Sequence, residues 1–455
     1  MREPHRRRWP SRLTLAVVNA VLPVICAAQS APEAEKLPAT NPAALDMSFD
    51  EAHAAPTGAS AAKDSDKSGG GFWRVLRPTR VTLAAEASYK LAAPQYWVKD
   101  RASVRVEYAK HFLDQSFLQF DAKQTVFLDQ DHRHDPEGTD TSVSQAYVQS
   151  SLYKTSVSLG VQTVAWGESI LAPITDEVSP RDNRELFNFN LEELRVGQPM
   201  VSVDQYSDFG RFSAFYTPQP KFNKSPQKGS AYYFVPPNVT IERSADAQRT
   251  SPEYGLNWRK SFGRADVSVM AAHLIDNDYA LRADGPDRFV QEKTKYSLAG
   301  MTYSYTTGQF LFKSELGWKS PKAFNDAQMQ IVRRNELDAY LGMEYRHSST
   351  LSLNFEGVNQ HISGWDSTIQ TPRNRQTYLL TVTKLLMHDD LSIQWLQFLN
   401  RPDTSTLTML MTSYKWNDNV TLSLNAICPS TRNPRSGLYL VRDQKQLAFK
   451  IQYQF

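Results

Sequence analysis

From about residue 77 to the last residue, apolar and polar side chains alternate along the chain. The segment 447–455 is the clearest example, because its five odd-numbered residues are apolar and three of the four residues between them are polar. Successive side chains of a β-strand point to opposite faces, so such a segment has one apolar and one polar face. Many segments run to about ten residues, the length of a tilted strand that crosses a bilayer, whereas soluble strands are nearer six. The pattern therefore predicts an all-β chain whose strands span a membrane.

The positions of aromatic residues and the lengths of the links support the same prediction. Tyr, Trp and Phe gather near the segment ends, as in the aromatic girdles of membrane barrels. Long and short links take turns, which is typical of outer-membrane barrels with tight periplasmic turns and long outer loops. We count about eighteen strands, with sixteen or fourteen as alternatives, and an even number leaves both chain ends on the periplasmic side. The long links are 128–141, 166–198, 218–250, 275–292, 319–333, 361–373 and 428–442.

Strands that cross hydrocarbon must close into a barrel, because every backbone N–H and C=O needs a partner inside the protein. We therefore predict a transmembrane antiparallel β-barrel with a lipid-facing apolar exterior and a polar lumen. A mean hydropathy of −0.49 excludes a helical membrane bundle. The predicted lumen holds charges of both signs, so its wall should select weakly for charge. These residues are Arg105, Glu107, Asp121, Lys123, Arg211, Lys313, Glu315, Asp338, Glu344, Arg346, Glu356 and Lys450.

The first residues carry targeting features. Five Arg and one Glu up to Arg12 precede a mainly apolar run that ends at Ala28, so residues 1–28 are predicted to be a secretory signal peptide. Residues 29–71 are poor in aromatic residues and are expected to be a disordered periplasmic lead-in, which leaves 72–455 for the barrel. Without the signal peptide the net charge falls from +3 to −1 (3 − 4), which excludes a basic nucleic-acid-binding protein.

The link 166–198 differs from a solvated outer loop. A Ser-Pro-Arg-Asp that begins at Ser179, and Asn190 three residues before Glu193, are typical of helix starts, so two short helices are expected. Trp166 and several Phe and Leu residues would be costly to expose, so we expect the loop to fold into the lumen as a constriction or plug. The alternative is an outward loop with solvated charges. The charged residues are Glu168, Asp176, Glu177, Arg181, Asp182, Arg184, Glu185, Glu192, Glu193 and Arg195.

The same loop resembles a known family. Trp-Gly-Glu from Trp166, the acid Asp176, Ser-Pro-Arg-Asp-x-Arg-Glu over 179–185 and Leu-Glu-Glu-Leu-Arg over 191–195 resemble a large family of proteobacterial outer-membrane proteins. That family is known mainly as a domain of unknown function and is taken to be porin-like. The resemblance implies a barrel, an outer-membrane address and no established catalytic residues. The final Phe455 is similar to the signal that barrel assembly machinery recognises. The barrel pattern is also similar to alginate-export-type barrels, whose lumen, unlike this one, is dominated by basic residues.

Other constellations of residues carry weaker signals. The stretch 129–137 is rich in Asp and His, but its spacing fits no established metal loop, so a solvated outer loop is expected. No Ser-His-Asp spacing stands out, so no catalytic residue, metal or cofactor is predicted.

These observations together predict an outer-membrane channel, not an enzyme, for the passive passage of small polar or amphipathic solutes. The expected partners are outer-membrane lipid and lipopolysaccharide, barrel assembly machinery and the solute, with no nucleic acid and with a homo-oligomer left open. One alternative is an export or lipid-handling barrel coupled to inner-membrane machinery. A hydrolase acting on lipids or peptides is the less favoured alternative.

Overall fold

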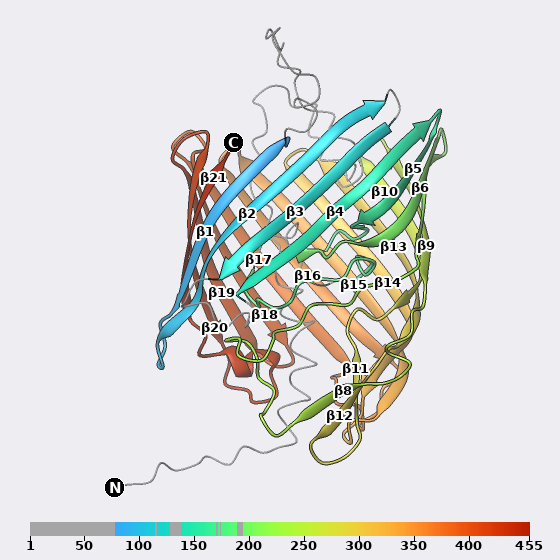
Figure 1. Ribbon diagram of the computed structural model, residues 1–455, viewed down its shortest axis with the longest axis vertical. Helices are drawn as coiled ribbons and strands as arrows, with labels where there is room; N and C mark the ends of the chain where they lie inside the picture. The colour runs from blue at the N-terminus through green and yellow to red at the C-terminus, as the bar shows by residue number, and fades with distance from the viewer. Residues whose placement is uncertain (1–77, 114–115, 128–137, 170–171, 173, 189–193) are drawn as a thin grey trace.

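Eighteen strands form one closed antiparallel barrel in the computed structural model (Figure 1). The structure describes residues 78–113, 116–127, 138–169, 172, 174–188 and 194–455. The barrel strands are β1 (Arg80–Lys90), β2 (Tyr96–Leu113), β3 (Ser116–Phe127), β4 (Thr139–Leu152), β5 (Thr155–Gln162), β6 (Gln198–Ser207), β7 (Gly210–Thr217), β9 (Glu253–Phe262), β10 (Ala265–Ile275), β13 (Lys295–Thr307), β14 (Phe310–Asn325), β15 (Ile331–Ser348), β16 (Leu351–Ser363), β17 (Asn374–Leu386), β18 (Leu391–Arg401), β19 (Ser405–Lys415), β20 (Val420–Ser430) and β21 (Gln446–Gln454). A separate three-stranded sheet contains β8 (Thr240–Arg243), β11 (Ala280–Ala283) and β12 (Arg288–Glu292).

The first and last strands close the barrel. β1 pairs with β2 on one side and with β21 on the other, where Ala85 lies opposite Ile451. Beyond that ladder, the backbone N–H of Phe455 donates to the carbonyl oxygen of Val81 at 3.0 Å. Closure gives the strand edges the partners that hydrocarbon would not supply. The prediction of an antiparallel barrel of about eighteen strands is confirmed, and the alternatives of sixteen and fourteen are not needed.

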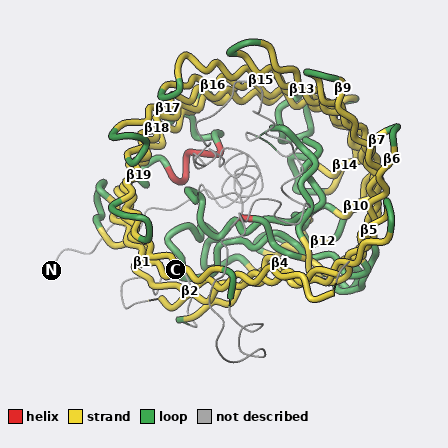
Figure 2. The backbone as a smooth tube through the Cα atoms, turned by 90° about the horizontal axis from the view of Figure 1, so that it is seen from above, coloured by secondary structure: helices red, strands yellow, loops and turns green. Residues whose placement is uncertain are grey.

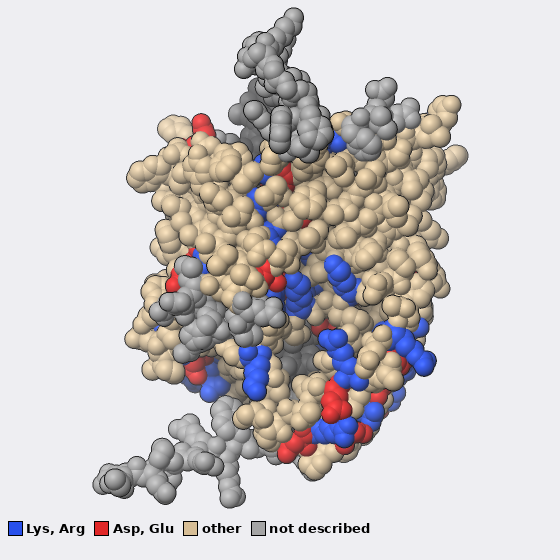
Figure 3. Space-filling view, in the orientation of Figure 1, with Lys and Arg blue, Asp and Glu red and all other residues tan. Residues whose placement is uncertain are grey.

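Apolar side chains cover the outside of the barrel. On β15, Leu337 and Leu341 are exposed at 44% and 70%, whereas Asp338 between them is completely buried inside. Most charged side chains on the face in Figure 3 lie in its lower half, and the wall above them is largely uncharged. This distribution suits a wall surrounded by hydrocarbon, because the apolar band of a membrane barrel faces lipid.

Short turns and long links lie at opposite ends of the barrel. The C-terminus lies at one end, and the small three-stranded sheet lies at the other (Figure 1). Five two-residue turns of the described residues lie at the same end as the C-terminus, namely 153–154, 208–209, 263–264, 308–309 and 349–350. The asymmetry of the links predicted from the sequence is therefore present in the fold.

One predicted long link, 319–333, is wrong. β14 and β15 stay paired up to Asn325 opposite Ile331, so only residues 326–330 connect them. The link 431–445 contains the short 3₁₀ helix η2 (Gly437–Val441), which the Ser436 side chain caps. Among the described residues, no helix combines the length and the apolar character needed to cross a membrane.

Candidate functional site

The link between β5 and β6, residues 163–197, is here called the inward loop. Its apolar side chains are buried, with exposures of 6% for Trp166, 0% for Ile174 and 2% for Leu186. Figure 2, a view along the barrel, shows segments without regular structure inside the ring of strands. The inward folding predicted from the apolar residues is observed, and the role of the loop as a constriction stays a prediction.

The first of the two predicted helices in this loop is wrong. Instead of a helix after Ser179, the backbone N–H of Asp182 donates to Leu194 O at 2.7 Å, and that of Val196 donates to Pro180 O at 2.8 Å. Lys224 bonds the same stretch from another link. These long-range bonds use the backbone groups that a helix would need. The second predicted helix falls mainly on 189–193, outside the described residues.

Glu315 on β14 anchors the inward loop to the barrel wall. Its carboxylate accepts hydrogen bonds from the backbone N–H groups of Glu168 (2.8 Å), Ser169 (3.0 Å) and Thr175 (2.7 Å). The Thr175 hydroxyl donates a fourth bond at 2.6 Å. Glu315 is only 2% exposed, so water does not reach this place. Its carboxylate therefore supplies the acceptors that the buried backbone N–H groups of the loop need.

Glu177 forms a second anchor. The Tyr296 hydroxyl donates to it at 2.9 Å, and the Lys319 ammonium bonds it while also pairing with Asp338 at 2.9 Å. Burial alone would raise the pKa of Glu177, but the positive charges of Lys319 and Lys322 lower it to about 2. The charged form of this buried carboxylate is therefore stabilised by specific partners from β13 and β14.

Asp176 holds the loop together internally. It accepts bonds from Arg181 at 3.1 Å, Arg195 at 3.0 Å and the backbone N–H of Trp166 at 3.3 Å. Burial opposes its ionisation, but Arg195 and Arg181 lower the pKa of Asp176 below its usual value. The Trp166 ring packs edge-on against Phe215 of β7 at 5.3 Å between centroids. These predicted site residues therefore shape the loop.

Two glycines let the loop approach the wall. A Cβ at Gly300 on β13 would lie 2.4 Å from Thr175 Cγ2, and one at Gly317 on β14 would lie 2.8 Å from Ile174 Cγ2. Both distances are shorter than two carbon atoms tolerate. The loop thus occupies the space that side chains would fill at these inward positions.

One part of the inner wall is apolar, which the prediction of a polar lumen did not include. Leu379, Leu396, Phe398 and Met409 of β17–β19 are at most 1% exposed, and Ile174, Leu186 and Phe187 of the loop belong to the same cluster. Apolar residues are favourable here because the loop and the wall bury one another.

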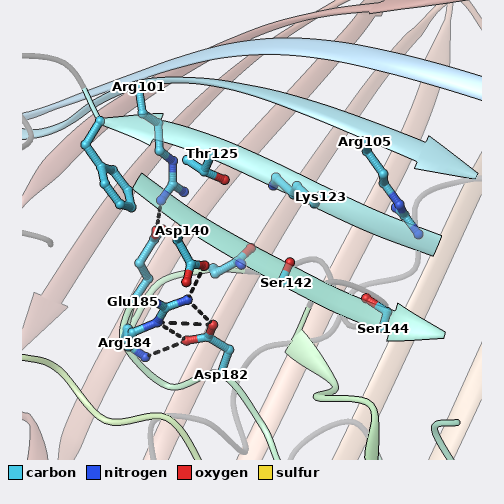
Figure 4. Close-up of a pocket in the computed structure, with 12 residues that line it drawn as sticks. Arg101, Arg105, Lys123, Thr125, Asp140, Ser142, Ser144, Asp182, Arg184 and Glu185 are labelled. Carbon is cyan, nitrogen blue, oxygen red and sulfur yellow. Dashed lines mark hydrogen bonds and ion pairs between the residues drawn. The ribbon is translucent and has the colours of Figure 1, made fainter. Parts of the chain in front are cut away.

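A partly open hollow with a cavity volume of about 60 Å³ lies between the loop and the wall on β2, β3 and β4 (Figure 4). It brings together five predicted site residues: Arg105, Lys123, Asp182, Arg184 and Glu185. The other lining residues are Arg101, Thr125, Phe127, Asp140, Ser142, Ser144 and Asn188.

Ion pairs connect the loop to the wall at this hollow. Glu185 of the loop pairs with Arg101 and, at 2.5 Å, with Lys99, both on β2. Arg184 pairs with Asp140 of β4 at 2.7 Å and with Asp182 of its own loop at 2.5 Å. The side chains keep some exposure to the hollow, 12% for Glu185 and 10% for Arg101.

The remaining predicted residues have different positions. Asp121 pairs with Arg105 at 2.7 Å, and Glu107 lies 3.7 Å from the same arginine, nearer the end of the C-terminus. Glu168 is buried, and burial raises its pKa to about 7, with Lys313 acting in the opposite direction and Glu315 adding to the rise. Glu192 and Glu193 lie outside the described residues.

Sequence reasoning missed Glu86, Lys99, Arg101, Asp140 and Lys319. A signal for Arg101 was available, because it continues the inward alternation that includes Arg105 on the same strand. The meeting of Glu86 with Lys99 was not predictable from alternation, since a register shift at residues 88–89 sets it.

Among the described residues, no group of three or more His, Cys, Asp and Glu side chains is arranged to hold a metal ion. The stretch 129–137 falls on residues that the structure does not describe. The hollow is instead a mixed-charge surface with hydroxyl groups from Thr125, Ser142 and Ser144.

Residues 58–451 match a protein family described as "Protein of unknown function (DUF1302)". The chain belongs to this family. The match covers most of the barrel and confirms the expected family of unknown function, whereas the loop motif itself stays a prediction. The search of curated proteins found no significant match.

Three of the solved structures with a similar fold are outer-membrane proteins of Pseudomonas aeruginosa and Acinetobacter baumannii. Pseudomonas aeruginosa OccK8 (OprE) aligns with a TM-score of 0.53 and 8% identity, covering 83% of this chain and 97% of that one. Acinetobacter baumannii OccAB2 gives 0.52 and 11%, covering 83% and 97%. Pseudomonas aeruginosa OpdL gives 0.50 and 10%, covering 83% and 98%. At such identities the likeness shows the fold alone, which is that of outer-membrane porins.

Proposed function

We propose that this chain is an outer-membrane channel for the passive passage of small polar or amphipathic solutes. The observation that carries the proposal is the solvent-open hollow between the inward loop and the β2–β4 wall, inside a closed barrel with an apolar exterior. Charged and hydroxyl side chains line the hollow, so water and polar solutes can replace one another along it. The proposal assigns no catalytic residue, metal or cofactor.

The proposed location is the outer membrane of a Gram-negative cell. The lipid-facing wall supports it, together with the signal peptide predicted at 1–28. We place the end with the short turns and the C-terminus in the periplasm, because periplasmic turns are the tight ones in this class of barrel. Outer-membrane lipid, lipopolysaccharide and barrel assembly machinery are then the proposed partners, and a homo-oligomer stays open.

Within this channel we propose that the inward loop is the constriction. Glu315 and Glu177 hold it against β13 and β14, so it leaves room chiefly on the opposite side, next to β2–β4. Arg184 and Glu185 reach across that remaining gap to wall residues. The size of solutes that pass is then determined by the distance between the loop and this wall.

Planar bilayer recordings test both parts of the proposal. Purified full-length protein should give stepwise conductance, and a barrel that inserts into lipid but stays silent would contradict a channel. Replacement of residues 176–195 by a short Gly-Ser linker should give larger steps. The same steps as in the parent protein would contradict the constriction. A far-UV spectrum dominated by strand would confirm that the linker variant is folded.

The two alternative functions predict other results. An export or lipid-handling barrel would transport only with inner-membrane machinery, so it would be silent alone in the bilayer. A hydrolase would cleave lipids or peptides without added partners. The similarity to alginate-export-type barrels stays a prediction, which the mixed charges of the hollow do not favour.

A further inference from the structure

We propose that Lys99, Arg101 and Lys450 form an anion-binding site on the inner wall, and that the Glu185 carboxylate occupies this site when no solute is bound. The proposal rests on the proposed channel function and names its substrate class, small organic carboxylates. In this arrangement Glu185 acts as a built-in competitor that an incoming carboxylate replaces.

On the wall itself, the cations of the site outnumber the carboxylates. The carboxylate oxygens of Glu86 on β1 lie 2.9 Å from Arg101 Nη2, 3.3 Å from Lys99 Nζ and 3.8 Å from Lys450 Nζ. Among these four side chains, three cations surround one wall carboxylate, so their charges sum to +2. Glu185 from the loop brings the second carboxylate and lowers this charge to +1.

The site is reached from the hollow. Arg101 and Glu185 both line it, and their paired groups point toward each other across the gap between β2 and the loop (Figure 4). Arg105 and Lys123 line the same hollow farther along β2 and β3. A carboxylate that enters the hollow therefore meets basic side chains in succession, with Arg101 at the point where the loop touches the wall.

Exchange at this point conserves charge. One carboxylate replaces another on the same cations, so the cations keep a counterion, and the displaced Glu185 carboxylate is solvated in the hollow that it lines. The Arg101–Glu185 pair keeps some contact with the solvent of the hollow, so salt screens it in part, which favours the exchange. The loop need not leave the lumen, because Glu177 and Glu315 hold it at other positions.

Two probes of nearly the same shape test the site directly. Butyrate carries the carboxylate, and butyramide is its uncharged counterpart. Binding to the full-length protein in detergent micelles can be followed by saturation-transfer NMR, which needs no transport. We expect butyrate, and not butyramide, to bind, with an affinity that falls as salt rises.

Glu185→Gln removes the competing charge while it keeps the side-chain shape. This variant should bind butyrate roughly fivefold more tightly, the factor expected when a competing, partly exposed ion pair is lost. Butyramide should be unaffected. The matched control is Glu242→Gln, which removes an ion pair with Arg288 at 2.8 Å on the small outer sheet and should leave butyrate binding unchanged.

Arg101→Met removes a cation of the site, and Arg288→Met is its control. The Arg101 variant should lose most butyrate binding, while Lys99 and Lys450 still accompany Glu86 and keep the wall paired. Equal binding of butyrate and butyramide to the parent protein would overturn the anion site. Unchanged butyrate affinity in Glu185→Gln would overturn the competitor role.

The outcomes separate this inference from the proposed function. If the parent protein binds butyrate in micelles but is silent in bilayers, the channel fails and the anion site stands. If it conducts but does not discriminate butyrate from butyramide, the channel stands and the anion site is wrong. In a conducting Glu185→Gln variant, the ratio of anion to cation permeability should rise.

Discussion

Glu315 and Glu168 show how two neighbouring glutamates take different roles in one buried place. Glu315 receives four hydrogen bonds from the loop, three of them from backbone N–H groups. Within the described part of the chain, Glu168 Oε2 is buried without a hydrogen-bond partner. The first side chain therefore holds the loop, and the second takes up a proton more readily than an ordinary glutamate does.

Glu315→Gln should loosen the inward loop. The amide cannot accept all four bonds and brings two donors of its own, so docking of the loop should weaken by about 3 kcal/mol. Hydrogen exchange of residues 168–175 should become faster while the barrel strands keep their protection. Glu344→Gln, which removes only a distant pairing of 3.9 Å with Arg346, is the control and should leave the exchange of the loop unchanged.

Glu168 should make docking of the loop depend on pH. Because its pKa is raised from 4.5 to about 7, the folded loop binds a proton that the free chain has released between these values. Docking of the loop should therefore become less favourable as pH rises through this window, and its free energy should level off above it. Hydrogen exchange, corrected for intrinsic rates, at about pH 5 and about pH 8 measures the change.

Glu168→Gln should abolish this difference, because the amide does not titrate. The charges nearest to Glu168 are Lys313, Glu315, Arg259 and Asp266, and they remain in the variant. A pH difference of the same size in Glu168→Gln would assign the effect to one of these groups.

At the scale of elements, β13 and β14 are the strands that receive the loop. Their inward faces carry Gly300 and Gly317, with Tyr296, Glu315 and Lys319 above and below these glycines. The strands thus combine empty positions, where the loop backbone fits, with polar groups that bond it. The wall on β2–β4 meets the loop through charged side chains at the hollow, through Val98 of β2 and through the close approach of Gly197 to Ser144 of β4.

Gly300→Val should displace the loop from β13. The added side chain would overlap Thr175, and such overpacking should destabilise the docked loop by about 1–3 kcal/mol. Larger conductance steps or faster exchange of loop amides would report the displacement. Ala299→Val on the exposed outer face of the same strand should change neither, and a similar effect of both variants would assign the result to the strand itself.

At the scale of the whole molecule, closure depends on the last strand. β21 pairs with β20 and β1, and Phe455 continues this pairing through its backbone with Val81. Phe455 is 60% exposed, and the centroid of its ring lies 5.4 Å from that of Tyr453. The backbone of this residue therefore closes the barrel, while its ring is mostly exposed.

Phe455→Ala should separate folding from assembly. The backbone bonds to Val81 persist, so the stability of the refolded barrel should change by less than about 0.5 kcal/mol. If the ring is the assembly signal, the amount inserted in the outer membrane of cells should fall several-fold. Phe449→Ala, another exposed aromatic of β21, is the control, and equal losses for both variants would contradict a special role of the last residue.

The strands were predictable because lipid imposes the same demand on every outward residue, so the alternation at 447–455 continues through the barrel. The inward position of the loop was predictable from Trp166, whose exposure would be costly. The helix after Ser179 was not, because a cap is a local signal and the bonds to Leu194 and Lys224 are long-range. The anchors Glu315 and Lys319 depend on where the loop lies against β14, which alternation does not specify.

The apolar contact between the inward loop and β16–β20 restricts which motions the loop can make. Swinging the loop away as a unit would expose Phe398, Leu396 and their neighbours to water, at about 1.5–3 kcal/mol for each large side chain. On the β2–β4 side the loop would part from charged groups, which water solvates well, and from the smaller apolar contact with Val98 and Tyr96 of β2. The anchors and the apolar contacts therefore fix the loop along β13–β20, and its edge next to β2 is held mainly by ion pairs. We expect solutes to pass along that edge.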